Sequence, residues 1–182
     1  MRVSIDIDGV VASTVPHMIK AIEKRGYSVT FDRYNPHIEG VENIEDLMYE
    51  VVGEIYSMQM DQIKPYKDAI IAIPAISRDL GQITFVTARK EEWRDATLKW
   101  LQNHFKIPFD LVHMRSSEKP QFILKEGFGV FIEDRLRTAN RAAEAGINTY
   151  LVNRSWNIGR PTHKDVIRVN TLTAFYIIEA VK

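Results

Sequence analysis

The sequence predicts an α/β protein: a Rossmann-like parallel sheet with helices on both faces and a small helical cap inserted after the first strand. Two observations carry this prediction. Short β-rich runs alternate with segments of helical periodicity, which is typical of a parallel sheet with crossover helices. One interval between strands is far longer than the others, which indicates an insertion. The predicted strands span residues 3–7, 82–87, 110–113, 129–133 and 148–152.

Helical signals fill the connections between the later strands. Residues 137–145 are rich in alanine and stop at Gly146, a residue type that commonly ends helices. At the C-terminus, Thr171 could cap a last helix over residues 172–179. Helical spacing of large apolar side chains also links Trp93, Thr97, Trp100, Leu101 and Phe105.

The long interval lies between Ile7 and Gln82 and is roughly three times a normal crossover. Two stretches within it, residues 11–22 and 44–56, each place apolar residues on one helical face. Residues 27–40 between them read as an irregular loop. The insertion is therefore predicted to be a small helical subdomain.

These patterns divide the chain into a core and a cap. We assign residues 1–10 and 66–182 to the α/β core and residues 11–65 to the cap. Pro74 interrupts an otherwise helical stretch early in the second core segment, so we expect a kink or a new helix start there.

The composition excludes several classes of partner. The 182 residues carry 24 Lys and Arg against 24 Asp and Glu, so no global field attracts nucleic acid polymers or an anionic membrane. The chain contains no cysteine, which excludes disulfides, thiolate metal sites and cysteine nucleophiles together. The first residues lack the features of a secretory signal, so the cytoplasm is the expected location. A small metabolite is the expected partner, and a homodimer stays open.

Acidic residues gather at the ends of two predicted strands. Asp6 and Asp8 follow the first strand, where Gly9 lets the chain turn sharply, and Glu133 and Asp134 end the fourth. Functional groups of an open parallel sheet collect beyond the carboxyl ends of its strands. Two like charges about 4 Å apart repel by about 4 kcal/mol at an intermediate dielectric unless a cation intervenes. Such oxygen ligands favour Mg²⁺.

A hydroxyl and an ammonium group complete this predicted site. Thr87 ends the second strand, and Lys119 follows the third after a loop. Opposite bound Mg²⁺ they would form an anion site suited to phosphate. Taken singly, Thr87 fits a helix N-cap, Lys119 fits a solvated charge, and the Glu133-Asp134 pair fits an acidic helix start. Their joint occurrence at strand ends favours the functional interpretation.

The order Asp-x-Asp-Gly-Val, then Thr, Lys and Glu-Asp resembles the haloacid dehalogenase superfamily of phosphotransferases, over essentially the whole chain. The resemblance implies that Asp6 is a nucleophile that forms an aspartyl-phosphate. It implies that Asp8 is the general acid of the first step and the base of the second. Because Asp8 must start protonated, we expect crowding by the other carboxylates to raise its pKa.

The resemblance also implies a set of metal ligands. Mg²⁺ would be bound by the side chains of Asp6 and Asp134 and by the main-chain carbonyl of Asp8, with Glu133 reached through water. The metal would hold the attacking carboxylate and the phosphoryl group together and offset their repulsion.

Phosphate contacts are implied for Thr87 and Lys119, which would stabilise charge on the phosphoryl oxygens. Ala88 and Arg89 follow Thr87 directly and are assigned to the same substrate-binding segment. Arg89 and Arg115 could add phosphate contacts or be ordinary surface residues.

Within the superfamily, the cap, residues 85–89 and the Glu133-Asp134-Arg135 ending look most like 5'(3')-deoxyribonucleotidases and their bacterial relatives. Those enzymes carry two Asp residues where this chain has Glu133-Asp134. Residues 153–157 resemble their polar-aromatic segment after the fifth strand. The resemblance therefore implies a Mg²⁺-dependent nucleotidase that acts on (deoxy)nucleoside monophosphates.

Aromatic residues of the cap are candidates for stacking on a nucleotide base. Two of them, Tyr49 and Tyr56, lie near the apolar stripe of a predicted helix and fit a core position better. Loop residues are the stronger candidates. The full set is Phe31, Tyr34, Tyr49 and Tyr56.

Other functions remain open from the sequence. One is a phosphatase of another small metabolite, such as a sugar phosphate. Another is a non-hydrolytic phospho-acceptor or binding module, which would share the acidic cluster, the Thr and the Lys on a parallel sheet. Asp8 beside the nucleophile and the long insertion oppose that alternative, because a simple acceptor needs neither.

Overall fold

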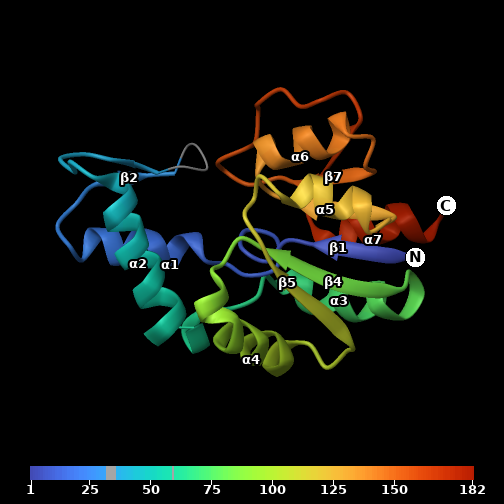
Figure 1. The fold of residues 1–182 in the computed structure, drawn as a ribbon, viewed down its shortest axis with the longest axis horizontal. Coiled ribbons are helices and arrows are strands. Elements are labelled where there is room, and N and C mark those ends of the chain that lie inside the picture. Colours follow the sequence, from blue (N-terminus) through green and yellow to red (C-terminus); the bar gives the residue numbers. More distant parts are fainter. Residues whose placement is uncertain (32–35, 59) are drawn as a thin grey trace.

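The computed structural model describes residues 1–31, 36–58 and 60–182. Its centre is a six-stranded sheet in the order β5-β4-β1-β6-β7-β8, and all neighbouring strands are parallel (Figure 1). The predicted α/β class with a parallel sheet is confirmed. The strands are β1 (Arg2–Ile5), β4 (Gln82–Thr87), β5 (Phe109–His113), β6 (Val130–Glu133), β7 (Thr149–Val152) and β8 (Val166–Val169).

Helices connect the strands and build the cap. In Figure 1, α1, α2 and β2 project to one side of the sheet. No helix in the described ranges combines the length and the apolar character needed to cross a bilayer. The α-helices are α1 (Val15–Glu23), α2 (Ile44–Met58), α3 (Lys67–Asp79), α4 (Arg94–His104), α5 (Lys119–Lys125), α6 (Leu136–Glu144) and α7 (Leu172–Ala180), with short 3₁₀ turns at Met60–Gln62 and Glu91–Trp93.

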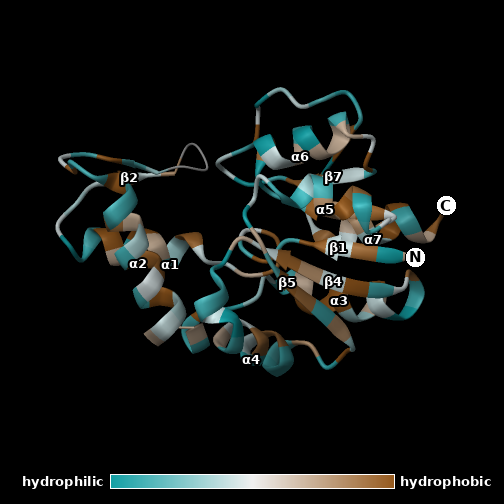
Figure 2. Ribbon diagram, viewed as in Figure 1, coloured by the Kyte–Doolittle hydropathy of each residue, from teal (hydrophilic) through white to brown (hydrophobic). Residues whose placement is uncertain are grey.

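The sheet buries both of its faces, as alternation along β6 shows. Ile132 belongs to the apolar cluster that contains Ile73 of α3 and Phe175 of α7. Its neighbour Phe131 belongs to a second cluster with Ile123 of α5. Successive side chains of a strand point to opposite faces, so α3 and α7 cover one face and α5 and α6 the other. Figure 2 shows hydrophobic residues along β4 and β5, while hydrophilic and hydrophobic residues alternate along α6.

The cap contains a small element that the sequence did not predict. Residues 27–40 were expected to form an irregular loop, yet Val29–Thr30 (β2) and His37–Ile38 (β3) pair as antiparallel strands, so that expectation is wrong there. Each strand is only two residues long, which is too short for a periodic signal. Tyr34 lies outside the described residues. The limits 11–65 of the cap remain a prediction.

Helix α3 includes Pro74 within its length. Of the two alternatives predicted there, the new helix start is therefore wrong, and the kink stays a prediction. Proline removes one helical hydrogen bond and normally disfavours this position. Here Ala69, Ile73 and Ile76 of α3 are buried against the sheet. Packing of that stripe outweighs the local preference of the proline.

Two chain segments join the cap to the core and run side by side. Ser13 N–H donates to Lys64 O (3.0 Å), and Tyr66 N–H donates to Val11 O (2.9 Å). Ala12 and Pro65 form an antiparallel bridge between them. The two connections therefore form a short ribbon directly after Asp8.

Candidate active site

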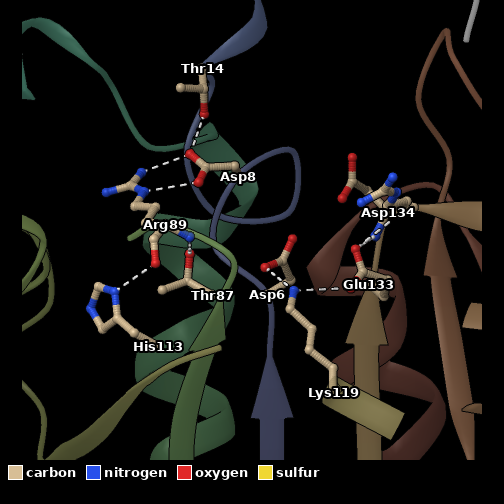
Figure 3. Close-up of polar contacts among 10 residues, drawn as sticks. Asp6, Asp8, Thr14, Thr87, Arg89, His113, Lys119, Glu133 and Asp134 are labelled. Atoms are coloured by element: carbon tan, nitrogen blue, oxygen red, sulfur yellow. Dashed lines mark hydrogen bonds and ion pairs between the residues drawn. The ribbon is translucent and has the colours of Figure 1, made fainter. Parts of the chain in front are cut away.

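Three carboxylates converge at the carboxyl ends of β1 and β6 (Figure 3). Asp6 follows β1, Glu133 is the last residue of β6, and Asp134 comes next. One carboxylate oxygen from each residue can be chosen so that the three atoms lie within 4.8 Å of one another, and all three residues are buried. The parallel register that pairs Ile5 with Ile132 brings the two strand ends level, as the sequence predicted.

Lys119 lies between two members of this carboxylate cluster, Asp6 and Glu133. Its Nζ is 2.6 Å from Asp6 Oδ1 and 3.2 Å from Glu133 Oε2. The side chain is 1% exposed, so the interpretation of Lys119 as a solvated charge is wrong. Glu133 also accepts the backbone N–H groups of Asp134 (3.2 Å) and Arg135 (3.0 Å). Glu133 therefore holds two groups in place: the side chain of Lys119 and the backbone of the turn after β6.

The cluster holds more negative charge than one ammonium group can neutralise. Burial, and then the charge of Glu133, raise the pKa of Asp6 from its ordinary 3.8 to about 8, although Lys119 opposes the shift. Burial, Glu133 and Asp6 also raise the pKa of Asp134 well above its usual range. Burial would lower the pKa of Lys119, but the charges of Asp6 and Glu133 raise it. The site thus favours an additional cation.

The donor atoms fit a small divalent cation. Asp134 Oδ1 is buried and has no hydrogen-bond partner, although Trp156 Nε1 donates to the other oxygen, Oδ2, at 2.7 Å. A buried, unpartnered carboxylate oxygen is costly unless a ligand satisfies it. Carboxylate oxygens at this density are ligands typical of Mg²⁺. Asp6 and Asp134 are therefore able to hold this metal.

Gly9 allows the turn after β1 to approach Asp134. Its φ of +85° lies in the left-handed region, which residues with a side chain rarely adopt. A Cβ atom at this position would lie 2.1 Å from Asp134 Oδ2. Both the conformation and the close approach require glycine.

Asp8 is held apart from the cluster by an ion pair with Arg89. Arg89 Nε and Nη2 donate to the two carboxylate oxygens at 2.8 and 2.7 Å, and Thr14 Oγ1 donates to Oδ1 at 2.5 Å (Figure 3). Burial alone would raise the pKa of Asp8, but the charge and hydrogen bonds of Arg89 lower it below 3.8. The expected rise is therefore wrong, because the charge and hydrogen bonds of Arg89, together with the hydrogen bonds of Thr14 and Tyr56, outweigh the effect of burial.

The segment after β4 meets the site in three different ways. Thr87 is fully buried, and its Oγ1 accepts the backbone N–H of Arg89 at 3.2 Å. Ala88 lines the main cavity. Arg89 is 3% exposed, and its guanidinium also lies over the ring of Tyr56, 4.4 Å from the centroid. Arg89 is thus a buried partner of Asp8 and not an ordinary surface residue.

A cavity of about 560 Å³ opens between this cluster and the cap. Its floor includes Asp6, Asp8 and Lys119. Its cap side is largely apolar and is formed by Val15, Met18, Phe31, Pro36, Ile44, Met48 and Val52. The cavity can therefore enclose a small molecule whose reactive group reaches the carboxylates.

The four aromatic candidates of the cap separate in the structure. Phe31 and Tyr56 line the main cavity, and Tyr56 is buried against Arg89. Tyr49 is half exposed outside this cavity, and Lys90 Nζ lies 3.8 Å from its ring centroid. A core position was expected for both tyrosines. That prediction is wrong for Tyr49, which is exposed, and confirmed for Tyr56, which is buried.

The loop after β7 supports the site in a way that the sequence only hinted at. Trp156 lines the main cavity and donates to Asp134, and Asn157 Nδ2 donates to Asp134 O at 2.7 Å. Arg154 Nε donates to Gly9 O at 2.6 Å. The polar-aromatic run at residues 153–157 was the available signal, but its contacts depend on how the strands are arranged.

The strand order and the helical cap after β1 correspond to the haloacid dehalogenase fold. No family model and no curated protein matches the sequence. A haloacid dehalogenase hydrolase of family IA, variant 3, from Entamoeba histolytica matches with a TM-score of 0.66 and 17% identity, over 99% of this chain and 97% of that chain.

Two further solved structures show the same architecture. The D,D-heptose 1,7-bisphosphate phosphatase of Burkholderia thailandensis has a TM-score of 0.62 and 12% identity, over 100% of this chain and 99% of its own. CbbY of Rhodobacter sphaeroides, solved in complex with phosphate, has a TM-score of 0.59 and 12% identity, over 94% of each chain. At sequence identities this low, the structural similarity shows a shared fold and no more. The activity must therefore be argued from the site.

Proposed function

We propose that this protein is a Mg²⁺-dependent phosphomonoester hydrolase that acts through an aspartyl-phosphate on Asp6. One observation carries the proposal: Asp6 lies at the floor of the main cavity, within a carboxylate cluster that Lys119 alone does not neutralise. A nucleophilic carboxylate beside a cation site is the arrangement that phosphoryl transfer needs.

The reaction divides into two displacements at phosphorus. In the first, an oxygen of Asp6 forms a bond to phosphorus while the bond to the substrate oxygen breaks, and Asp8 gives its proton to that oxygen. In the second, water attacks phosphorus, Asp8 takes a proton from the water, and the bond to Asp6 breaks. Inorganic phosphate and an alcohol are the products.

The contacts of Asp8 favour its role as a base over its role as an acid. Arg89 and Thr14 favour the ionised carboxylate, which suits the base of the second displacement. Its task as acid requires a proton that the Arg89 ion pair disfavours. We infer that this pair loosens as the phosphate group of the substrate enters the main cavity.

Mg²⁺ bound by Asp6, Asp134 and the main-chain carbonyl of Asp8 would supply charge neutralisation and alignment. Lys119 offsets charge on Asp6 and lines the main cavity, where its ammonium group would donate to a phosphoryl oxygen. Thr87 fixes the backbone that carries Ala88 into the cavity wall.

A sugar phosphate is the substrate class that the related structures favour. One of them is named as a phosphatase of a heptose bisphosphate, and CbbY has also been solved with xylulose-(1,5)bisphosphate. The nucleotidase resemblance finds no such support among these structures. These likenesses extend to the fold, so they suggest where a substrate screen should begin.

A nucleoside monophosphate is the second candidate, and the apolar cap wall favours it. Phe31 and Met48 on that wall offer surfaces for a base, whereas a sugar needs hydrogen-bonding partners. A substrate that loses affinity on Phe31→Ala would use this wall.

Phosphate release tests the proposal directly. Sugar phosphates, nucleoside monophosphates and phospho-amino acids are incubated with the protein and Mg²⁺, with the Asp6→Asn variant as the control. We expect Mg²⁺-dependent turnover of at least one class and none by the variant. A long-lived phosphorylated Asp6 without turnover would instead identify a phospho-acceptor and contradict hydrolysis.

A further inference from the structure

A second cavity adjoins the candidate active site. Its volume is about 400 Å³, and it lies between the segment that follows β5 and the beginning of α6. Ala88 and Ser116 line both this cavity and the main cavity. The two cavities therefore border each other at these two residues.

Arginine side chains dominate the second cavity, which we call the arginine cavity. Arg115, Arg137 and Arg141 line it together with the hydroxyl groups of Ser116 and Ser117. In the part of the chain that the structure describes, no carboxylate pairs with these three guanidinium groups.

The nearest carboxylate contact leaves this positive charge in place. Glu118 accepts the backbone N–H of Arg115 at 3.2 Å, and no contact joins it to the guanidinium group of Arg115. Arg135 also lines the cavity. The cavity therefore carries an excess of hydrogen-bond donors and of positive charge.

The positions of Arg137 and Arg141 on helix α6 are electrostatically unfavourable. The helix has no acidic residue in its first turn, and Arg137 lies there, at the positive end of the helix dipole. Arg141 follows four residues later, and like charges at this spacing repel. An anion between these residues would remove both penalties.

We propose that the arginine cavity binds a second phosphate group of the substrate, so that the preferred substrates are small bisphosphorylated molecules. The inference rests on the proposed hydrolase function. The phosphate that reacts lies at Asp6 and Lys119, and the other one lies among Arg115, Arg137 and Arg141. Guanidinium groups bind phosphate through pairs of charge-assisted hydrogen bonds, which fits a dianion better than a neutral hydroxyl.

Matched substrates and a charge variant test the proposal. Hexose monophosphates are compared with hexose bisphosphates, and adenosine monophosphate with adenosine bisphosphate. The variant Arg137→Gln/Arg141→Gln removes two charges from an exposed helix surface. The control Lys24→Gln/Lys125→Gln removes two charges from exposed lysines that line neither cavity. Thermal unfolding of both variants checks that they fold.

We expect the wild type to prefer the bisphosphate in kcat/KM by about tenfold or more, as one or two charge-assisted contacts allow. The arginine variant should lose most of this preference, while the lysine variant keeps it. Equal losses for the monophosphate and the bisphosphate would overturn the proposal. Absence of phosphate release from every substrate would instead contradict the hydrolase function.

Calorimetry with Asp6→Asn separates binding from catalysis. A bisphosphate should bind this variant more tightly than its monophosphate, and the difference should disappear when Arg137→Gln/Arg141→Gln is added. Inorganic phosphate is titrated as a third ligand. If it binds to the arginine cavity as tightly as the bisphosphate does, the site takes free phosphate and the proposal for the substrate is wrong.

Discussion

At the scale of single residues, the contacts of Asp8 set the first prediction. Asp8→Asn removes the proton donor and acceptor but keeps a side chain of nearly the same shape. A substrate with a very good leaving group needs no acid in the first displacement, so the phosphorylated enzyme should accumulate. Mass spectrometry after rapid quenching measures it. Turnover of an ordinary phosphomonoester at the wild-type rate would refute the role of Asp8.

Arg89 offers a second prediction at this scale. Arg89→Lys cannot form two parallel hydrogen bonds to Asp8 and should destabilise the protein by about 1–3 kcal/mol in urea unfolding. The control Arg94→Lys changes a partly exposed arginine that pairs with Glu91 and donates to Leu111 O at 3.1 Å, and it should change stability by about 0.5 kcal/mol or less. Similar losses in the two variants would contradict a structural role for the buried pair.

The same pair makes stability sensitive to acid. Because the pKa of Asp8 is lower in the folded protein than its ordinary 3.8, the ionised form stabilises the fold above that pH. This contribution is lost as the pH falls through the lower folded value. In Arg89→Lys the acid-dependent loss should be smaller, which a series of unfolding curves between neutral and acidic pH measures.

At the scale of structural elements, the turn after β1 depends on Gly9. Gly9→Ala introduces both left-handed strain and the overlap with Asp134, and should cost about 2 kcal/mol or more. Gly127→Ala is the matched control, since its φ is +65° and nothing lies within 4 Å of the added Cβ. It should cost about 1 kcal/mol. Equal losses would exclude a contribution from the contact with Asp134.

The sequence predicted those elements whose signals are local. Predicted strand ranges match β4 fully and the other four predicted strands within two residues at each end. Strand β8 was not predicted, since its four residues include Arg168 and follow a polar segment. Its pairing with β7 depends on position at the sheet edge, which periodicity does not contain.

The candidate site divides in the same way. The strand ends predicted that Asp6, Asp8, Glu133 and Asp134 converge, because parallel strands end at one edge. The structure brings Asp6, Glu133 and Asp134 together, whereas Asp8 pairs with Arg89 instead. The pair of Asp8 with Arg89 joins residues 81 positions apart, and that of Trp156 with Asp134 joins residues 22 apart. Such contacts depend on side-chain direction in the folded chain. The expected pKa of Asp8 failed for this reason.

At the scale of the whole molecule, the buried charge of the site couples stability to pH and metal. The pKa of Asp6 rises from 3.8 to about 8 on folding, so the folded, metal-free protein binds more protons than the unfolded chain between these values. Its stability should therefore fall as the pH rises through this range. Mg²⁺ needs ionised carboxylates, so its stabilising effect should grow over the same range.

Thermal unfolding with and without Mg²⁺ at several pH values checks this coupling. Asp6→Asn removes the titrating group and should flatten the decline in the metal-free protein. It should also reduce the shift that Mg²⁺ produces. A melting temperature that is independent of both pH and Mg²⁺ in the wild type would show that the carboxylate cluster binds no cation.

The ribbon that joins the cap to the core has a mechanical consequence. Thr14 lies just beyond this ribbon at the start of α1, Tyr56 belongs to α2, and Arg89 belongs to the core, yet all three meet at Asp8. A rotation of the cap about its paired connections would move Thr14 and Tyr56 relative to Asp8 and Arg89. The pKa of Asp8 would then depend on the position of the cap, because movement of Thr14 and Tyr56 would change the hydrogen bonds that lower it.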